Sequence, residues 1–182
     1  MEGNPKRCLV FVNPVSGSGQ AVKIWNTEVK LMLKDAQTQY TCIITEKADH
    51  AKEFMMTVDA SAFDVVLAIG GDGLFYEVIQ GLSTRPDSMF ILSKLPLAAI
   101  PGGTGNGLAK TVLFEVNESF SSLNATYIAL KGRPRPMDLS MVILTFSAKV
   151  PRFISFYFHI RLQRNQVYTT HSSASRGVWS RT

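Results

Sequence analysis

The stretch Phe63-Asp64-Val65-Val66-Leu67-Ala68-Ile69-Gly70-Gly71-Asp72-Gly73 decides the fold of this chain. Its apolar run is rich in β-branched residues and ends abruptly in glycines, which predicts a buried strand over 64–69 followed by a tight turn. Glycines permit positive φ values and the close approach of a ligand to the backbone. The single carboxylate of the turn, Asp72, lies at the carboxyl end of the strand, where open α/β sheets bind their ligands. The turn therefore suits phosphate or metal chemistry beside one acidic group.

The rest of residues 1–142 alternates between strand patterns and helix patterns. Besides 64–69, we predict strands at 7–13, 39–45, 96–100 and 139–143. We predict helices at 20–36, at 46–57 with Thr45 as the cap, directly after the glycine turn, at 106–113 and at 118–131. This alternation, with short connections, predicts an α/β domain whose parallel sheet is covered by helices on both faces.

Three glycine-rich turns each follow a predicted strand, namely 13–19, 70–73 and 101–107. In a parallel sheet these turns emerge at one edge, where backbone amides and helix N-termini form anion sites. The GxxxxGK[ST] phosphate loop is excluded, because Leu108 follows the last glycine, and Val22 interrupts a GxGxxG pattern. A single glycine turn is equally well explained as plain punctuation. Three such turns at one edge favour a nucleotide site of a non-standard type.

Composition limits the class of protein. The 182 residues are 46% apolar and 18% charged, which is typical of a globular domain. Residues 1–142 carry 13 basic and 14 acidic side chains, whereas residues 143–182 carry 6 basic and no acidic ones. The basic excess thus belongs to the last segment alone, so the pI near 9.3 predicts no nucleic-acid partner.

Other features of the sequence favour a cytoplasmic protein. No apolar run approaches the roughly 20 residues that span a bilayer, and the polar start shows no signal-peptide core. The two cysteines, Cys8 and Cys42, lie in strand-like runs and are interpreted as reduced core thiols.

The turns carry a more specific resemblance. Asn13-Pro14 with Gly17 and Gly19, Gly71-Asp72-Gly73 with Glu77, and Pro101-Gly102-Gly103-Thr104-Gly105-Asn106 together resemble the catalytic domain of the diacylglycerol kinase-like lipid kinases. Within that group, the segments 45–51, 85–87 and 136–139 resemble sphingosine (long-chain base) kinases. The resemblance covers residues 6–142, which we take as the catalytic, ATP-binding domain.

This resemblance implies a mechanism and a set of site residues. Asp72 matches the acid that activates a lipid hydroxyl for attack on the γ-phosphate of ATP, a step that needs one base near the nucleophile. ATP is implied as the phosphate donor and Mg²⁺ as the ion that screens its charge, with no protein ligand assigned to the metal. The implied nucleotide-site residues are Asn13, Pro14, Gly17, Gly19, Thr45, Asp49, Gly70, Gly71, Gly73, Glu77, Gly103, Thr104, Gly105 and Asn106.

Two residues near the predicted site, Glu77 and His50, can also be explained without a role in nucleotide binding. Glu77 lies one turn into a helix and is explained either as a solvated side chain or, as we prefer, as part of the site. His50 fits a helix surface as well as it fits a nucleotide contact.

The resemblance stops after Val142, where the family's second, largely β domain is expected and its pattern is absent. Residues 143–182 alternate in places, over 154–162, so one strand is possible there; a basic-aromatic segment in peripheral contact with anionic lipid is a second interpretation. We favour a third, an unstructured or aberrant tail. The leading hypothesis is a truncated sphingoid-base kinase of low or no activity. The alternatives are a non-catalytic nucleotide-binding or regulatory fragment and a diacylglycerol or ceramide kinase relative.

Overall fold

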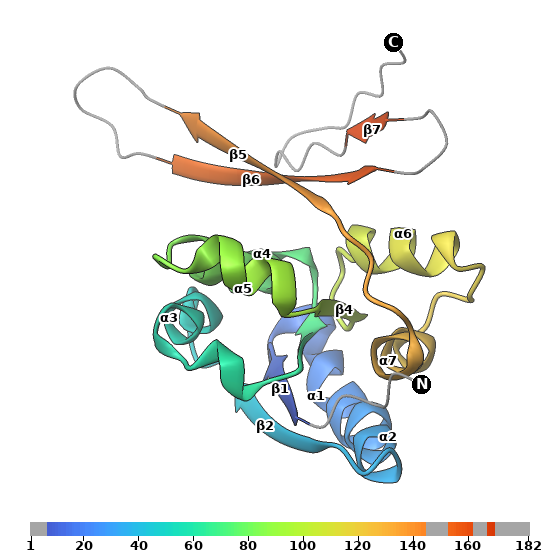
Figure 1. Ribbon diagram of the computed structural model, residues 1–182. Coiled ribbons are helices and arrows are strands. Elements are labelled where there is room, and N and C mark those ends of the chain that lie inside the picture. The colour runs from blue at the N-terminus through green and yellow to red at the C-terminus, as the bar shows by residue number, and fades with distance from the viewer. Residues whose placement is uncertain (1–6, 145–152, 162–166, 170–182) are drawn as a thin grey trace. The chain divides into compact units, whose positions relative to one another are not determined.

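The computed structural model describes residues 7–144, 153–161 and 167–169. Its first sheet has the strand order β2-β1-β3-β4, and every neighbouring pair is parallel (Figure 1). The strands are β1 (Arg7–Val12), β2 (Gln39–Ile44), β3 (Val65–Gly70) and β4 (Leu97–Pro101). All six residues of β3 are buried, as expected of a strand whose two faces are both covered. The predicted parallel sheet is confirmed.

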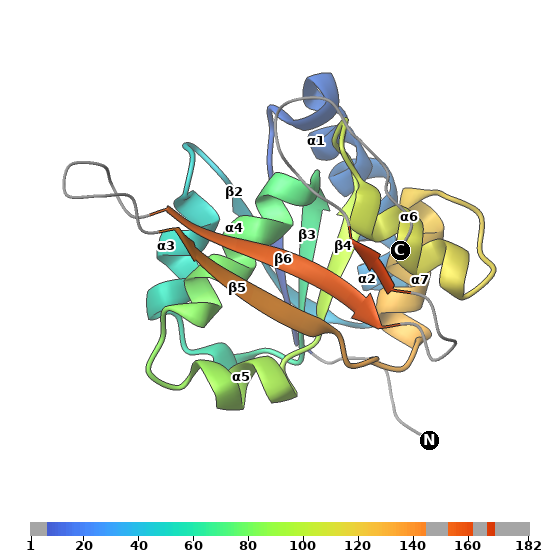
Figure 2. The same cartoon turned by 90° about the horizontal axis from the view of Figure 1, so that it is seen from above.

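Helices cover both faces of this sheet, as predicted. They are α1 (Gln20–Ile24), α2 (Lys30–Asp35), α3 (His50–Thr57), α4 (Asp72–Ser83), α5 (Ser88–Lys94), α6 (Gly107–Glu115) and α7 (Ser122–Lys131). Successive residues of a strand point to opposite faces. Val10 therefore packs in one core with Trp25 and Leu33, while the ring of Phe11 meets that of Phe54 on α3 edge to face, at 5.6 Å. Both layers are visible in Figure 2.

The predicted helix at 20–36 contains a π-helical turn, Trp25–Val29, between α1 and α2. On the apolar face predicted for this helix, Ala21, Trp25, Val29 and Leu33 are buried and Met32 is half-buried. The ring of Trp25 packs edge to face on Tyr40 at 5.2 Å. Asn26 and Thr27 of the π-helical turn donate side-chain hydrogen bonds to backbone carbonyls of α1, four residues earlier. Such bonds compete with the regular ladder, and the apolar period alone does not reveal them.

Two helix starts were predicted wrongly, and one helix was missed. α3 begins at His50 rather than at residue 46, because Asp49 adopts a left-handed conformation with φ of 60°, so Thr45 does not cap it. α7 begins at Ser122, where the hydroxyl of Ser121 accepts a hydrogen bond from the amide of Asn124. α5 was not predicted. Short 3₁₀ turns at Ser16–Gly19 and Ala60–Ala62 complete the described elements of this unit.

The chain divides into two compact units, residues 1–134 and 135–182, so the boundary predicted at 142 falls inside strand β5 (Asp138–Leu144). The described part of the second unit is an antiparallel sheet of order β5-β6-β7, with β6 at Phe153–Arg161 and β7 at Val167–Thr169. β6 falls on the alternating segment for which one strand was considered. The remaining residues of 143–182 lie outside the described ranges, so the prediction of an unstructured tail stays a prediction there. No helix among the described residues is long and apolar enough to cross a membrane.

Candidate active site at the carboxyl edge of the sheet

The candidate site lies where the direction of the chain through the sheet reverses. β1 is flanked by β2 on one side and by β3 on the other. The chain leaves β1 toward α1, which packs with Val10 and Val12, and leaves β3 toward α4, which packs against α3 on the opposite face. Neighbouring strands whose following helices lie on opposite faces open a crevice at their carboxyl ends. The turns 13–19 and 70–73 follow these two strands at that edge.

Backbone hydrogen bonds join the three predicted turns into one edge. The amide of Asn13 donates to the carbonyl of Ile69 at 3.1 Å, which links the first turn to the second. The amide of Gly102 donates to the carbonyl of Gly70 at 3.0 Å, and that of Asp72 donates to the carbonyl of Gly105 at 2.9 Å. The predicted convergence of the turns is therefore confirmed, although residues 13 and 105 are far apart in the sequence.

Close backbone packing explains three of the glycines at this edge. A Cβ on Gly17, whose φ is +56°, would lie 2.6 Å from the carbonyl oxygen of Gly102. A Cβ on Gly71 would lie 2.7 Å from the carbonyl oxygen of Gly105, and one on Gly103 would lie 2.6 Å from the Cα of Gly71. Such distances exclude any side chain. These glycines serve loop-to-loop contact, and among the described glycines only Gly17 and Gly19 have the positive φ that was expected at 70–73.

Gly73 differs from its neighbours. A Cβ built on it meets no atom within 4 Å, so packing within the described chain gives no reason for a glycine there. Gly73 is the second residue of α4, whose N-terminus carries a partial positive charge. Open space over the first turn of a helix, beside two glycine-rich loops, is a suitable place for a phosphate group.

Asp72 is the first residue of α4, and its carboxylate spans to another helix. Oδ2 accepts a hydrogen bond from the amide of Gly107 at 2.8 Å, and Oδ1 accepts one from the amide of Leu108 at 3.1 Å. The side chain thus satisfies two free amides at the N-terminus of α6. The prediction identified Asp72 but missed these two amides, since only the third dimension brings positions 35 and 36 residues away to the carboxylate.

The two asparagines of the predicted set stabilise their own loops. The Asn13 side chain accepts from the amide of Val15 at 3.1 Å. The Asn106 side chain accepts from the amide of Gly103 at 3.2 Å and donates to the carbonyl of the same residue. Both side chains therefore shape the backbone that surrounds the site. The remaining predicted loop residues of the edge are Pro14 and Gly19 in the first turn and the exposed Thr104 and Gly105 in the third.

Thr45, Asp49 and Glu77 form a second group beside this edge. The amide of Thr45 donates to the carbonyl of Val12 at 2.8 Å, which fixes the segment that follows β2 next to β1. Burial raises the pKa of Glu77 on α4, and hydrogen bonds from the amides of Asp49 and Ala51 oppose that rise. Glu77 Oε2 is buried and meets no hydrogen-bond partner among the described residues. The carboxyl group therefore faces the N-terminus of α3 and is not a freely solvated side chain.

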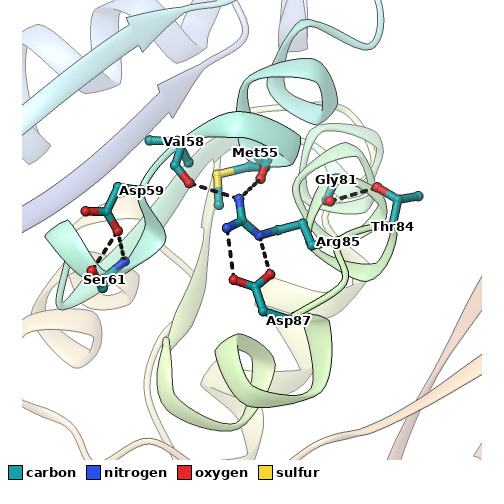
Figure 3. A network of polar contacts seen from close by, with 8 residues as sticks. All are labelled: Met55, Val58, Asp59, Ser61, Gly81, Thr84, Arg85 and Asp87. Atoms are coloured by element: carbon teal, nitrogen blue, oxygen red, sulfur yellow. Dashed lines mark hydrogen bonds and ion pairs between the residues drawn. The ribbon is translucent and has the colours of Figure 1, made fainter.

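The other end of α3 is held by Arg85, in the Arg85-Pro86-Asp87 corner that follows α4 (Figure 3). One guanidinium nitrogen donates to the carbonyls of Met55 and Val58, at 3.0 and 2.9 Å. The other two nitrogens pair with the carboxylate of Asp87 at 2.8 and 3.1 Å. Only 13% of the Arg85 side chain is exposed. The corner quoted for its family resemblance is thus a structural clamp between α3 and α4.

The arrangement places the N-terminus of α4, whose first amides can donate to a phosphate group, beside one acid. Within the described part of the chain, no three His, Cys, Asp or Glu side chains lie close enough together to hold a metal ion. An ion that binds through phosphate oxygens and water still fits, because Mg²⁺ commonly binds nucleotide phosphates with only one or two carboxylates.

Comparison with known proteins agrees with this geometry. The chain is 39% identical over 140 residues to sphingosine kinase 1 of Arabidopsis thaliana, covering 77% of this chain and 29% of that protein. It is 36% identical over 151 residues to sphingoid long chain base kinase 4 of Schizosaccharomyces pombe, covering 83% and 31%. It is 36% identical over 140 residues to human sphingosine kinase 1, covering 74% and 36%. The chain thus spans about a third of the length of these relatives.

Bacterial proteins are among the solved structures that resemble this fold. The crystal structure of a diacylglycerol kinase from Bacillus anthracis superimposes with a TM-score of 0.54 at 25% identity, over 76% of this chain and 42% of that one. Residues 7–142 match the diacylglycerol kinase catalytic domain. The chain therefore belongs to the diacylglycerol kinase catalytic domain family and is similar to sphingosine kinases.

Proposed function

We propose that this chain binds MgATP at the edge formed by its three turns and transfers the γ-phosphate to the hydroxyl of a sphingoid base. The observation that carries the proposal is the bonded set of turns 13–19, 70–73 and 101–107, with Asp72 between them and open space over Gly73. The relatives named sphingosine kinase or sphingoid long chain base kinase support the choice of lipid.

The first turn of α4 provides the place for phosphate. Its N-terminal partial charge favours an anion, and Gly73 lets the phosphate oxygens approach the backbone. Mg²⁺ enters with ATP as part of the substrate and neutralises charge on the phosphates.

Asp72 is proposed as the base that accepts the proton of the lipid hydroxyl. A carboxylate offers about four lone-pair directions, and the amides of Gly107 and Leu108 occupy one on each oxygen. The remaining directions are available to a hydroxyl. The two amides hold the carboxylate in one orientation, so the base is positioned before substrate binds.

The test is a transfer assay with labelled ATP, Mg²⁺ and sphingosine. The wild-type chain is compared with Asp72→Asn and with the control Asp87→Asn, which neutralises an exposed aspartate of the Arg85 corner. Because the chain spans about a third of its relatives, we expect labelled lipid from the wild type and the control at a low but measurable rate, and a rate at least about 100-fold lower for Asp72→Asn. A wild-type chain that does not bind ATP would contradict the phosphate site itself.

A second candidate function is a nucleotide-binding or regulatory fragment without catalysis. It is favoured by one observation, that the chain spans about a third of the relatives it matches. ATP binding with equal and negligible product from wild type and Asp72→Asn would support this candidate over the kinase.

A further inference from the structure

His50 makes a contact that the proposed reaction does not use. It is the first residue of α3 and directly follows the segment 45–49. Its Nδ1 accepts a hydrogen bond from the backbone amide of Glu46 at 3.1 Å. The imidazole therefore bridges the helix to the start of the segment, and it closes that segment into a loop from its carboxyl end.

The segment 45–49 is also held at its start and at its end. At its start, the amide of Thr45 is bound to the carbonyl of Val12. At its end, Asp49 has a left-handed backbone with a φ of 60°, and its amide donates a hydrogen bond to the Glu77 carboxyl group. An ion pair between Lys47 and Glu53 also reaches across, but both side chains are more than half exposed, and such pairs contribute little.

We propose that His50 is a positioning residue for the nucleotide: its Nδ1 holds the Glu46 amide and so fixes the segment 45–49 in the conformation that binds ATP. This inference rests on the proposed function and on the place of the segment 45–49, which follows β2 at the same carboxyl edge of the sheet as the three turns. The family resemblance assigns Thr45 and Asp49 of this segment to the nucleotide site. Glu77 holds the amide of Asp49 at one end of the segment, and His50 holds the amide of Glu46 near the other end. Without the bond to His50, the start of the segment can adopt other conformations, and ATP binding must select the bound one.

Substitution of His50 by asparagine or by glutamine distinguishes this role from a general need for a polar residue. The Oδ1 of asparagine lies near the place of Nδ1 and accepts a hydrogen bond there, whereas the glutamine amide reaches toward the place of Nε2. We expect His50→Asn to bind MgATP within about 2-fold of the wild type, because the bond is retained. We expect His50→Gln to bind about 3- to 10-fold more weakly, because one net hydrogen bond is lost.

The experiment measures MgATP affinity by calorimetry for the whole 182-residue chain and its two variants. Amide hydrogen exchange at Glu46 in the nucleotide-free chains is the second readout, since it reports the tether without any ligand. Slow exchange in the wild type and His50→Asn, and faster exchange in His50→Gln, is the expected result. α3 remains anchored by the buried Ala51 and Met55, so all three chains should fold.

The outcomes separate the tether from the proposed function. Equal affinities of all three chains overturn the inference while leaving ATP binding intact. Equal weakening by both variants also overturns it, because the imidazole would then act in another way than through Nδ1. A wild-type chain that binds no MgATP overturns the proposed function, and the positioning role falls with it even if Glu46 is protected.

Discussion

The two ends of α4 use charged residues in opposite ways. At its N-terminus, the Asp72 carboxylate accepts hydrogen bonds from amides that begin α6. Just beyond its C-terminus, the Arg85 guanidinium donates to carbonyls that end α3. The Asp72 carboxylate thus complements the partial positive charge at the N-terminus of α6, and the Arg85 guanidinium complements the partial negative charge at the C-terminus of α3. Both corners carry a short motif with a turn residue and an aspartate.

The difference between the two ends lies in the space that remains. At the N-terminal end, glycine backbones pack directly on one another, and the surface over Gly73 stays open. At the C-terminal end, the long side chain of Arg85 fills the corner and is 13% exposed. A ligand can therefore approach the first corner and not the second. A charged side chain at a helix end does not by itself indicate a binding site. Accessible backbone beside it, as at Gly73, makes ligand binding possible there.

The largest expected effect comes from Gly71→Ala, set against Gly73→Ala. The first variant forces a methyl group to within 2.7 Å of the Gly105 carbonyl oxygen, and we expect it to lower the free energy of unfolding by about 3 kcal/mol. The second meets no neighbour and gains helix propensity, so we expect stability equal to the wild type or higher by about 0.5 kcal/mol, with weakened ATP binding. Urea unfolding and calorimetric titration measure both quantities. Unchanged ATP affinity in Gly73→Ala would show that the open space over Gly73, which distinguishes the N-terminal from the C-terminal end of α4, is not needed for the nucleotide.

The next effect is at the other end of the helix. Arg85→Met keeps the apolar stem but leaves the carbonyls of Met55 and Val58 without their donor, and we expect a loss of about 2 kcal/mol in the free energy of unfolding. Asp87→Asn is the matched control. Its side chain is 50% exposed, so a cost below about 1 kcal/mol is expected. A loss of phosphoryl transfer in Arg85→Met larger than its stability explains would show that this corner also serves the site.

Asp72→Asn should be a smaller perturbation of stability than of activity. One half of the asparagine amide still accepts a backbone hydrogen bond, while the other half presents a donor to an amide donor of α6. The expected cost is about 1 kcal/mol, read from chemical denaturation. A cost above about 3 kcal/mol would mean that the carboxylate is mainly a structural cap, and a loss of activity in this variant could then not be assigned to catalysis.

The smallest effect concerns Glu77 and its dependence on pH. Because burial raises its pKa in the folded chain, the folded state holds this proton to higher pH than the unfolded state does. Its contribution to stability is therefore greatest below the ordinary carboxyl value of 4.5 and declines as pH rises through the raised folded pKa. Glu77→Gln should abolish this decline, so urea unfolding of the two chains should diverge as pH rises. Convergence with rising pH would instead show that the amides of Asp49 and Ala51 favour the ionised form.

A related measurement applies to a thiol far from these ends. Burial, and secondarily the charge of Asp64, raises the pKa of Cys8 to about 12. In the folded chain, Cys8 should therefore react with a thiol reagent far more slowly than the half-buried Cys42 near neutral pH. Comparable rates, followed by mass spectrometry, would indicate that β1 opens readily.

Much of the fold followed from apolar pattern and from glycine punctuation. The strands at 7–12, 39–44, 65–70 and 97–101 lie within about a residue of prediction. The two central strands are apolar because both of their faces are covered, and β2 is marked by its β-branched and aromatic residues. Helix boundaries followed less well. α3 starts where Asp49 turns the backbone, and the wide turn at Trp25–Val29 depends on side-chain bonds to carbonyls, neither of which leaves a period in the sequence.

From the sequence came the succession of the strands and of most helices, the three glycine turns and Asp72 as the acid among them; α5 was missed. These are local properties: β-branched runs favour strands, glycines end them, and parallel strands bring their following loops to one edge. Tertiary structure alone decided what each residue does at that edge. It showed that Gly71 and Gly103 serve packing, that Gly73 leaves space, and that Asp72 is bound to the start of α6. Those roles depend on residues that the sheet brings together from distant parts of the chain. Their spacing in the sequence does not reveal how close they lie in the structure.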